Sequence, residues 1–144
     1  MFWLVKSEPD SFSWAQQVAA GVEPWTGVRS HAARNNLAAM RVGERAFFYH
    51  SIAGREIVGV VEVAREAYPD PTAEAGGPWV CVDLRAVGAM PRPVTLAQVK
   101  ADPALSAMAL VRLSRLSVGP VGEAEWRRVC ELGGWGAQLP DKAG

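Results

Sequence analysis

Two stretches decide how this chain folds: Trp25-Thr-Gly-Val-Arg-Ser-His-Ala-Ala-Arg-Asn-Asn36 and Phe47-Phe-Tyr-His-Ser51. The first places an indole, a flexible glycine and two guanidinium groups within a short segment. The second is rich in aromatic residues, which favours a strand, and it ends in polar side chains. Together they predict a pocket with stacking walls and a polar floor, which would suit a flat ring with hydrogen-bonding edges.

A β-hairpin is predicted directly after the aromatic strand. Ala53-Gly54 is the turn signal, and it joins a strand over residues 45–51 to a long strand over residues 56–67. Gly59 interrupts the apolar run of the second strand. A glycine in a strand marks a bulge, a bend of a barrel or the close approach of a ligand. Three further strands are predicted, over residues 2–6, 79–87 and 110–118.

Four short helices are predicted around these strands. In the first, Ser11 is the N-cap and Gly21 closes the helix. In the second, Ser30 caps residues 31–40, whose apolar stripe lies on a different side from Arg34. In the third, Thr95-Leu-Ala-Gln98 is a capping box that opens a helix ending near Pro103. The fourth covers residues 123–132, with Trp126, Val129 and Cys130 facing inward, and a loose tail is expected from Gly133.

These elements predict an α+β fold in one domain, because the strands and helices follow no βαβ rhythm and no linker interrupts them. About five strands with short helices around them are best arranged as a small, curved or partly closed barrel. A chain of 144 residues is long enough to bury a core of this kind.

Composition and charge limit the classes of function that the protein can have. The net charge is zero, which argues against a protein that coats nucleic acid through bulk charge. Residues 29–65 nevertheless hold six arginines against three glutamates, so this segment is either a local basic face or an ordinary solvated surface. No apolar run reaches about 18 residues, and the N-terminus lacks the features of a signal peptide. Cys81 and Cys130 have no metal or disulfide spacing, and we expect buried thiols in a reducing cytoplasm.

A family resemblance rests on several motifs in the right order. They are Trp3-Leu-Val-Lys-Ser-Glu-Pro9, Trp25-x-Gly-Val-Arg29 with Ala33-Arg-Asn35, Phe47-Phe-Tyr-His-Ser51, Ile57-Val-Gly-Val60, Tyr68-Pro-Asp-Pro-Thr72, Pro93-Val-Thr-Leu96 and Leu110-Val-Arg112. On these residues the sequence resembles the EVE domain family, a branch of the PUA-like superfamily that also includes the YTH domains. The resemblance covers residues 2 to 130, and we interpret residues 1–144 as a single EVE domain.

The resemblance implies a PUA-like pseudobarrel with a concave pocket that reads modified bases, chiefly modified cytosines in DNA, with RNA recognition in relatives. Three positions depart from the family pattern. Members usually carry Asp where Thr26 stands, Asn or a similar amide at Ser30, and Gln at Ala32. The segment between Thr72 and Trp79 is also shorter than usual. These differences bear on which base is bound more than on how it is bound.

The candidate site is drawn from the polar and aromatic residues of these motifs. The base-binding pocket is expected from Ser7, Glu8, Trp25, Gly27, Val28, Arg29, Tyr49, His50, Ser51 and Trp79, and the nucleic-acid backbone contacts from Arg29 and Arg34. Each assignment has a structural alternative. Trp25 is either a stacking surface or a loop residue folded onto the core, and the arginines either bind the ligand or pair with Glu8 or Asp10. Glu8 either accepts the exocyclic amine of cytosine or caps a turn.

Alternation along residues 47–51 restricts what this strand can contribute. Phe47, Tyr49 and Ser51 share one face, and Phe48 and His50 share the other. One of these sets is expected to line the pocket, and the pattern does not choose between them. Because His50 and Ser51 point to opposite faces, they cannot form a hydroxyl–imidazole dyad. The sequence contains no Walker loop, no GxGxxG and no clustered metal ligands, so we expect no cofactor and no metal.

Three functions are compatible with this sequence. The leading hypothesis is a non-catalytic reader of a modified nucleobase, chiefly cytosine in DNA, in which the base is extruded and held beside Trp25. The second is a module that binds modified or structured RNA through the same pocket. The third is a small enzyme that acts on a nucleotide-like substrate, and the absence of a nucleophile–base pair makes it the least favoured. The expected partner is nucleic acid, and no membrane contact is expected.

Overall fold

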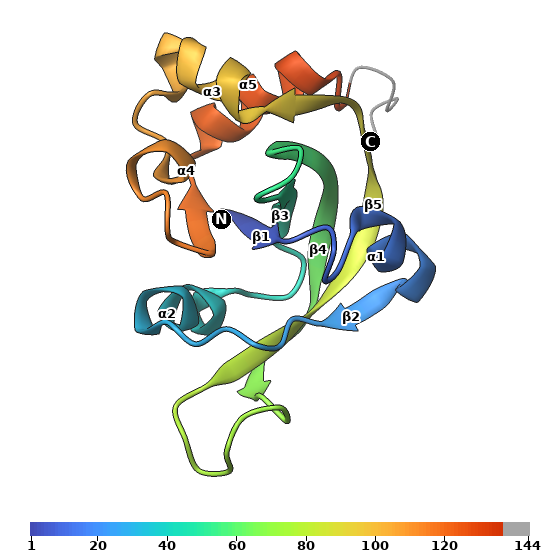
Figure 1. Ribbon diagram of the computed structural model, residues 1–144, viewed down its shortest axis with the longest axis vertical. Helices are drawn as coiled ribbons and strands as arrows, with labels where there is room; N and C mark the ends of the chain where they lie inside the picture. Colours follow the sequence, from blue (N-terminus) through green and yellow to red (C-terminus); the bar gives the residue numbers. More distant parts are fainter. Residues whose placement is uncertain (137–144) are drawn as a thin grey trace.

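A mixed sheet with the strand order β2-β5-β4-β3-β1-β6 forms the centre of the molecule (Figure 1), and its six strands all lie within residues 1–136, which the computed structural model describes. The strands are β1 (Phe2–Ser7), β2 (Val22–Pro24), β3 (Arg45–His50), β4 (Glu56–Pro69), β5 (Val80–Thr95) and β6 (Val118–Val121). The helices are α1 (Trp14–Ala20), α2 (His31–Ala39), α3 (Leu96–Ala101), α4 (Ala109–Arg112) and α5 (Glu123–Gly133), with a 3-10 turn, η1 (Pro103–Leu105). None of the helices in this part of the chain is both long and apolar enough to span a bilayer.

The strand β1 lies inside the sheet, between β3 and the edge strand β6, although it begins the chain. It pairs in parallel with β3 and antiparallel with β6. The remaining neighbours, β3 with β4, β4 with β5, and β5 with β2, are antiparallel. Because β1 and β3 run in the same direction, the residues that follow both strands meet at the same edge of the sheet. This edge carries the candidate site described below.

Alternating side chains give the sheet two apolar faces. Trp3, Val5 and Phe48 belong to one core, which also contains Ala33 and Leu37 of α2. The intervening residues of β1 and β3 belong to a second core, which is completed by α3, η1, α4 and α5. Figure 1 shows this division, with α3 and α5 on one side of the strands and α2 on the other.

The second core is built around the indole of Trp126. The rings of Phe47 and Phe2 stack on it, with centroid distances of 3.8 and 4.4 Å. Trp126 is 7% exposed, so its predicted inward orientation is confirmed, and Trp3 of the first core is 2% exposed. Cys81 is buried as predicted, whereas the Cys130 residue is only partly buried, and burial raises the pKa of its thiol to about 12.

The predicted α+β class and most of the helices are confirmed. Ser30 caps α2 by accepting a hydrogen bond from the amide of Ala33, and the Thr95–Gln98 capping box opens α3. The cap of α1 was predicted wrongly, because Ser13 and not Ser11 has a glutamine three residues later to complete a capping box. Helix α5 extends to Gly133, and the expected loose tail falls largely on residues 137–144, which lie outside the described part.

Three strand predictions need correction. Residues 22–24 form a strand that is not among those predicted, because their pairing partner on β5 is distant in sequence. Most of the strand predicted over residues 110–118 is instead α4 and a turn, and only its last residue belongs to β6. The strand predicted to end at residue 87 continues to Thr95. Its Pro91 and Pro93 fall in a stretch without β4 partners, where the missing amides cost nothing.

Gly59 lies where the β4–β5 register shifts and where the indole of Trp14 crosses the strand. A Cβ atom placed on Gly59 would lie 2.5 Å from Cη2 of Trp14. The close approach anticipated for this glycine is therefore made by a tryptophan of α1, which packs against the core. This contact fixes α1 on the sheet.

We predict that Gly59→Ala destabilises the protein by about 1–3 kcal/mol, because the new methyl group overpacks the Trp14 contact. Urea denaturation of the wild type and the variant gives this difference. Adding Trp14→Leu should recover part of the loss through a favourable coupling energy. Gly77→Ala is a comparison with a milder contact, since its Cβ would lie 3.3 Å from the carbonyl oxygen of Glu74, and it should cost less than Gly59→Ala. Additive effects of the Gly59 and Trp14 substitutions would contradict the packing described.

Candidate functional site

A cavity of about 650 Å³ opens at the edge of the sheet where β1 ends. Its wall is made by the end of β1, the loop that follows it, strand β2, the loop between β2 and α2, and one residue before β6. The lining residues are Lys6, Ser7, Glu8, Ser11, Phe12, Glu23, Pro24, Trp25, Thr26, Gly27, Val28, Arg29, Ser30 and Ser117. Specific ligand pockets have volumes of roughly 300–1,000 Å³, so this cavity is large enough for a nucleobase.

The loop of residues 25–29, which we call the cavity loop, is held to the sheet at its start. The amide of Trp25 donates to the carbonyl of Val82 on β5 over 2.7 Å. Two residues later Gly27 adopts a φ of +87°, a conformation that a side chain would strain. Ser30 then caps α2. The cavity loop is thus a sharp bend between a strand and a helix, with its backbone directed by a glycine.

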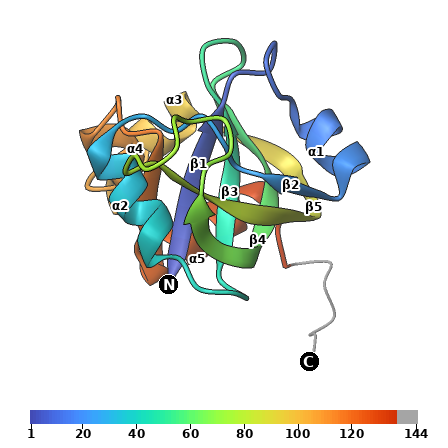
Figure 2. The ribbon, with the colours of Figure 1, turned by 90° about the horizontal axis from the view of Figure 1, so that it is seen from below.

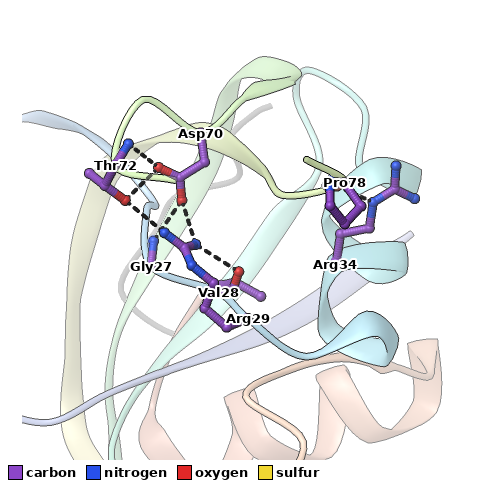
Figure 3. Close-up of polar contacts among 7 residues, drawn as sticks. All are labelled: Gly27, Val28, Arg29, Arg34, Asp70, Thr72 and Pro78. Atoms are coloured by element: carbon purple, nitrogen blue, oxygen red, sulfur yellow. Dashed lines mark hydrogen bonds and ion pairs between the residues drawn. The ribbon is translucent and has the colours of Figure 1, made fainter. Parts of the chain in front are cut away.

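A buried carboxylate holds the cavity loop in place from outside the cavity (Figure 3). One oxygen of Asp70, Oδ2, accepts hydrogen bonds from the Gly27 amide at 2.8 Å and from Nη1 of Arg29 at 3.0 Å. The other oxygen, Oδ1, accepts from the amide and the hydroxyl of Thr72, both at 2.7 Å. Nη2 of Arg29 also donates to the Thr72 hydroxyl at 3.1 Å. We call Gly27, Arg29, Asp70 and Thr72 the Asp70 clamp.

The clamp changes the acidity of its carboxyl group. Burial by itself would raise the pKa of Asp70, since its side chain has no exposed surface. The hydrogen bonds from Thr72 and Gly27 and the guanidinium of Arg29 outweigh burial and lower the pKa of Asp70 to about 2. The carboxylate is therefore charged at neutral pH and balanced by Arg29, whose side chain is 40% exposed. Arg29 therefore pairs with Asp70, and not with Glu8 or Asp10 as the structural alternative for this arginine supposed.

Trp25 is buried, and it still forms part of the cavity wall. Only 8% of its surface is exposed, and its ring meets those of Phe48 and Phe12 edge-to-face at 5.6 and 6.0 Å. The expectation of an indole free to stack in a polar loop therefore needs correction. The alternative, a loop tryptophan folded onto the core, describes its burial. Because Trp25 belongs to both the core and the cavity, removing its ring would cost stability as well as shape.

Six of the predicted site residues line the cavity, and four do not. Those at the cavity are Ser7, Glu8, Trp25, Gly27, Val28 and Arg29. The other four are Tyr49, His50, Ser51 and Trp79, which lie elsewhere for different reasons. Tyr49 faces the second core on the opposite side of β3, so the face of β3 that is closest to the cavity is the one that carries Phe48. Ser51 touches the cavity only indirectly, because its amide donates to the carbonyl of Ser7.

His50 and Trp79 both have structural contacts. Nε2 of His50 accepts a hydrogen bond from the amide of Trp14 at 3.0 Å, and burial lowers the pKa of the His50 imidazole. This acceptor is therefore engaged at the start of α1. Trp79 lies beside the ring of His31, with a centroid distance of 4.9 Å. Trp79 thus lies near the N-terminus of α2, and the guanidinium of Arg29 lies over its ring at 6.0 Å. Trp79 contacts a residue of the cavity wall without lining the cavity itself.

The arginine-rich segment is mostly paired. Arg45 and Arg41 form ion pairs with Glu62 and Glu66. Nε of Arg34 donates to the carbonyl of Pro78 at 2.8 Å (Figure 3), so the structural alternative, in which Arg34 pairs with Glu8 or Asp10, is not observed. These contacts support the interpretation of the segment as a solvated, charge-balanced surface.

Asp70 and Thr72 are the functional residues that sequence reasoning missed. They belong to Tyr68-Pro-Asp-Pro-Thr72, which from the sequence alone is interpreted only as a motif of the family resemblance. In this motif an aspartate lies between two prolines, and a threonine follows two residues after the aspartate. Such a pattern is typical of an aspartate whose side chain accepts hydrogen bonds from the backbone of its own loop. That this aspartate also reaches Gly27 and Arg29, more than forty residues earlier, is a tertiary contact without a local signature.

The chemistry that the cavity offers is recognition by hydrogen bonds and apolar contact. Its wall combines two aromatic rings, Phe12 and Trp25, with carboxylates, hydroxyls, Lys6 and the backbone of the cavity loop. Glu8 is exposed, and its carbonyl rather than its carboxylate closes the following turn by accepting from Ser11 and Phe12. Its carboxylate thus remains available to an amine donor. Among residues 1–136 no three histidine, cysteine or acidic side chains gather as metal ligands.

Comparison with known proteins shows to which family this chain belongs. The model of the EVE domain family matches residues 1–132. This chain belongs to the EVE domain family. It is 34% identical to human thymocyte nuclear protein 1, in an alignment that covers 90% of this chain and 72% of that protein.

Solved structures of related proteins have the same fold. An NMR structure of a Rhodopseudomonas palustris protein has 55% sequence identity and a TM-score of 0.91, with 98% of both chains covered. A crystal structure of the human thymocyte protein in complex with DNA that contains 5-methylcytosine has 33% identity and a TM-score of 0.85, with 92% of this chain and 96% of that chain covered. The PUA-like α+β fold implied by the family resemblance is thereby confirmed.

We predict that the Asp70 clamp makes stability depend on pH in the acid range. Because folding lowers the pKa of Asp70 from 3.8 to about 2, the stabilisation is complete above about pH 4 and disappears as the pH falls through 2. It amounts to about 2 kcal/mol. Denaturant titrations between pH 2 and 6 measure it. Asp70→Asn should be less stable at pH 6 and should lose this part of the pH dependence, whereas Asp10→Asn, at an exposed aspartate, should keep it.

Proposed function

We propose that this protein is a non-catalytic reader of modified cytosine in DNA, which holds an extruded base in the cavity beside Trp25. The observation that carries the proposal is the cavity itself, with aromatic side chains on one part of its wall and a glycine-directed backbone on another. The complex of human thymocyte nuclear protein 1 with DNA that contains 5-methylcytosine supports it, because that protein shares the fold and a third of the residues.

The polar groups of the cavity suit the edge of cytosine. The carboxylate of Glu8 can accept from the exocyclic amine, as acidic side chains do with this base. The hydroxyls of Thr26 and Ser30 line the same cavity. They stand where the family resemblance implies an aspartate and an amide, so hydroxyls here take over positions that offer stronger hydrogen-bonding groups in relatives. Phe12 and Trp25 provide apolar contact for the ring and its methyl group.

The role of Arg29 in this proposal is to position the cavity loop. Its guanidinium already bonds Asp70, Thr72 and the carbonyl of Val28. Its exposed surface can still face a phosphate, but loss of the side chain would first release the clamp. The proposal assigns no catalytic residue, because Nε2 of His50 is occupied by the backbone and Ser51 lies on the other face of the chain.

Binding titrations by fluorescence anisotropy test the proposal. The ligands are oligonucleotides that differ at one position, which is cytosine, 5-methylcytosine or 5-hydroxymethylcytosine, prepared as single strands, duplexes and RNA. We expect the modified DNA to bind more tightly than the cytosine control. Equal binding of all three bases would contradict a reader of modifications. Tighter binding of the RNA series would favour the alternative of an RNA module, and turnover of free nucleosides would favour an enzyme.

The way in which the base reaches the cavity leads to a second expectation. A base inside a duplex must leave the stack, which costs a few kcal/mol and costs least at a mismatch. We therefore predict tighter binding of a modified cytosine opposite a mismatch than of the same base correctly paired. A fluorescent adenine analogue beside the site should brighten on binding as its stacking neighbour leaves. Equal affinities without a fluorescence change would mean that the base is read in the groove.

A further inference from the structure

The tip of the β3–β4 hairpin holds an isoleucine in a strained conformation. Ile52 has a φ of +68°, which is a genuine outlier for a β-branched residue. The amide of Ala53 donates to the carbonyl of Ser51 at 2.8 Å, so Ile52 is the central residue of a three-residue turn of the rare form with positive φ. Arg55 in the same tip also has a positive φ, of +43°.

This strained tip is fixed at both of its ends. The amide of Ser51 donates to the carbonyl of Ser7 at 2.9 Å, and the carbonyl of Arg55 accepts from the amide of Leu96 at 2.9 Å. Strain of this kind persists only where the surrounding structure holds it, and it gathers at functional sites. A mobile loop would relax to an unstrained turn, whereas these bonds keep Ile52 in one position.

The tip presents an apolar side chain to solvent beside the cavity. Ile52 is 68% exposed, and Arg55 is exposed three residues later. Ser7, which bonds the hairpin, lines the cavity. Figure 2 shows the β3–β4 hairpin and the loop after β1 extending from the same side of the molecule. Single exposed apolar residues are common on proteins, but this one combines exposure and strain with a neighbour, Ser51, that is bonded to a residue of the cavity wall.

We propose that Ile52 is a wedge that enters the base stack of a duplex where the base has left it, with Arg55 facing the neighbouring phosphates. The proposal rests on the function proposed above, because a wedge is needed only if the base is extruded. Proteins that unstack DNA commonly insert apolar side chains, isoleucine among them, between base steps. A side chain held rigidly pays little conformational entropy on insertion.

The test compares Ile52→Asn with the wild type on duplex and single-stranded oligonucleotides that carry one 5-methylcytosine. Asparagine tolerates positive φ, so the variant should fold and should unfold at a temperature no lower than the wild type. We expect its affinity for the paired duplex to fall about tenfold, and its affinity for the single strand to stay unchanged, since a single strand has no stack to fill.

Val42→Asn is the matched control. Val42 is also β-branched and 58% exposed, and it precedes β3 at the end opposite the hairpin. The Val42→Asn variant should bind the duplex and the single strand with the affinities of the wild type. If Ile52→Asn binds the duplex as tightly as the wild type, or weakens duplex and single strand alike, the wedge is wrong while the reader proposal stands. If the wild type itself binds neither modified ligand, both proposals fail.

Discussion

The hydrogen bonds to the carboxylate of Asp70 are the interaction on which the cavity depends. A buried carboxylate is costly unless charged and polar donors surround it, and here four donors converge on its two oxygens. Two of them come from the cavity loop and two from Thr72. The carboxylate therefore ties the segment after β4 to the segment before α2. Without it, neither the bend at Gly27 nor the orientation of Arg29 would be fixed.

The sheet determines where this clamp has its effect. The parallel pairing of β1 with β3 brings Ser7 and Ser51 together at one edge. The loop after β1, the cavity loop and the hairpin tip all meet near this edge. A hydrogen bond between Ser51 and Ser7 thus links the exposed apolar tip to the wall of the cavity, and the two proposals above assign the cavity to an extruded base and the tip to the stack that it leaves. The two apolar cores on either side of β1 and β3 keep this edge rigid.

Local patterns predicted the parts of the fold that local chemistry controls. The serine before α2, the capping box before α3 and the strand of alternating aromatic residues each form within a few residues of chain. The prediction failed where distant partners decide the structure. The strand at residues 22–24 exists because β5 lies beside it, and the burial of Trp25 follows from Phe12 and Phe48. Asp70 was missed for the same reason, since its partners lie far away in sequence.

An NMR titration of amide and indole resonances tests the central claim most directly. The labelled protein is titrated with a single-stranded oligonucleotide that contains one 5-methylcytosine, and the cytosine oligonucleotide serves as the reference. If the clamped cavity loop forms the binding site, the largest shift differences between the two ligands will appear at the Gly27 amide and the Trp25 indole, and the Trp126 indole, in the second core, will shift little. The largest differences at Trp126 or elsewhere along α5, with Gly27 unmoved, would contradict the account.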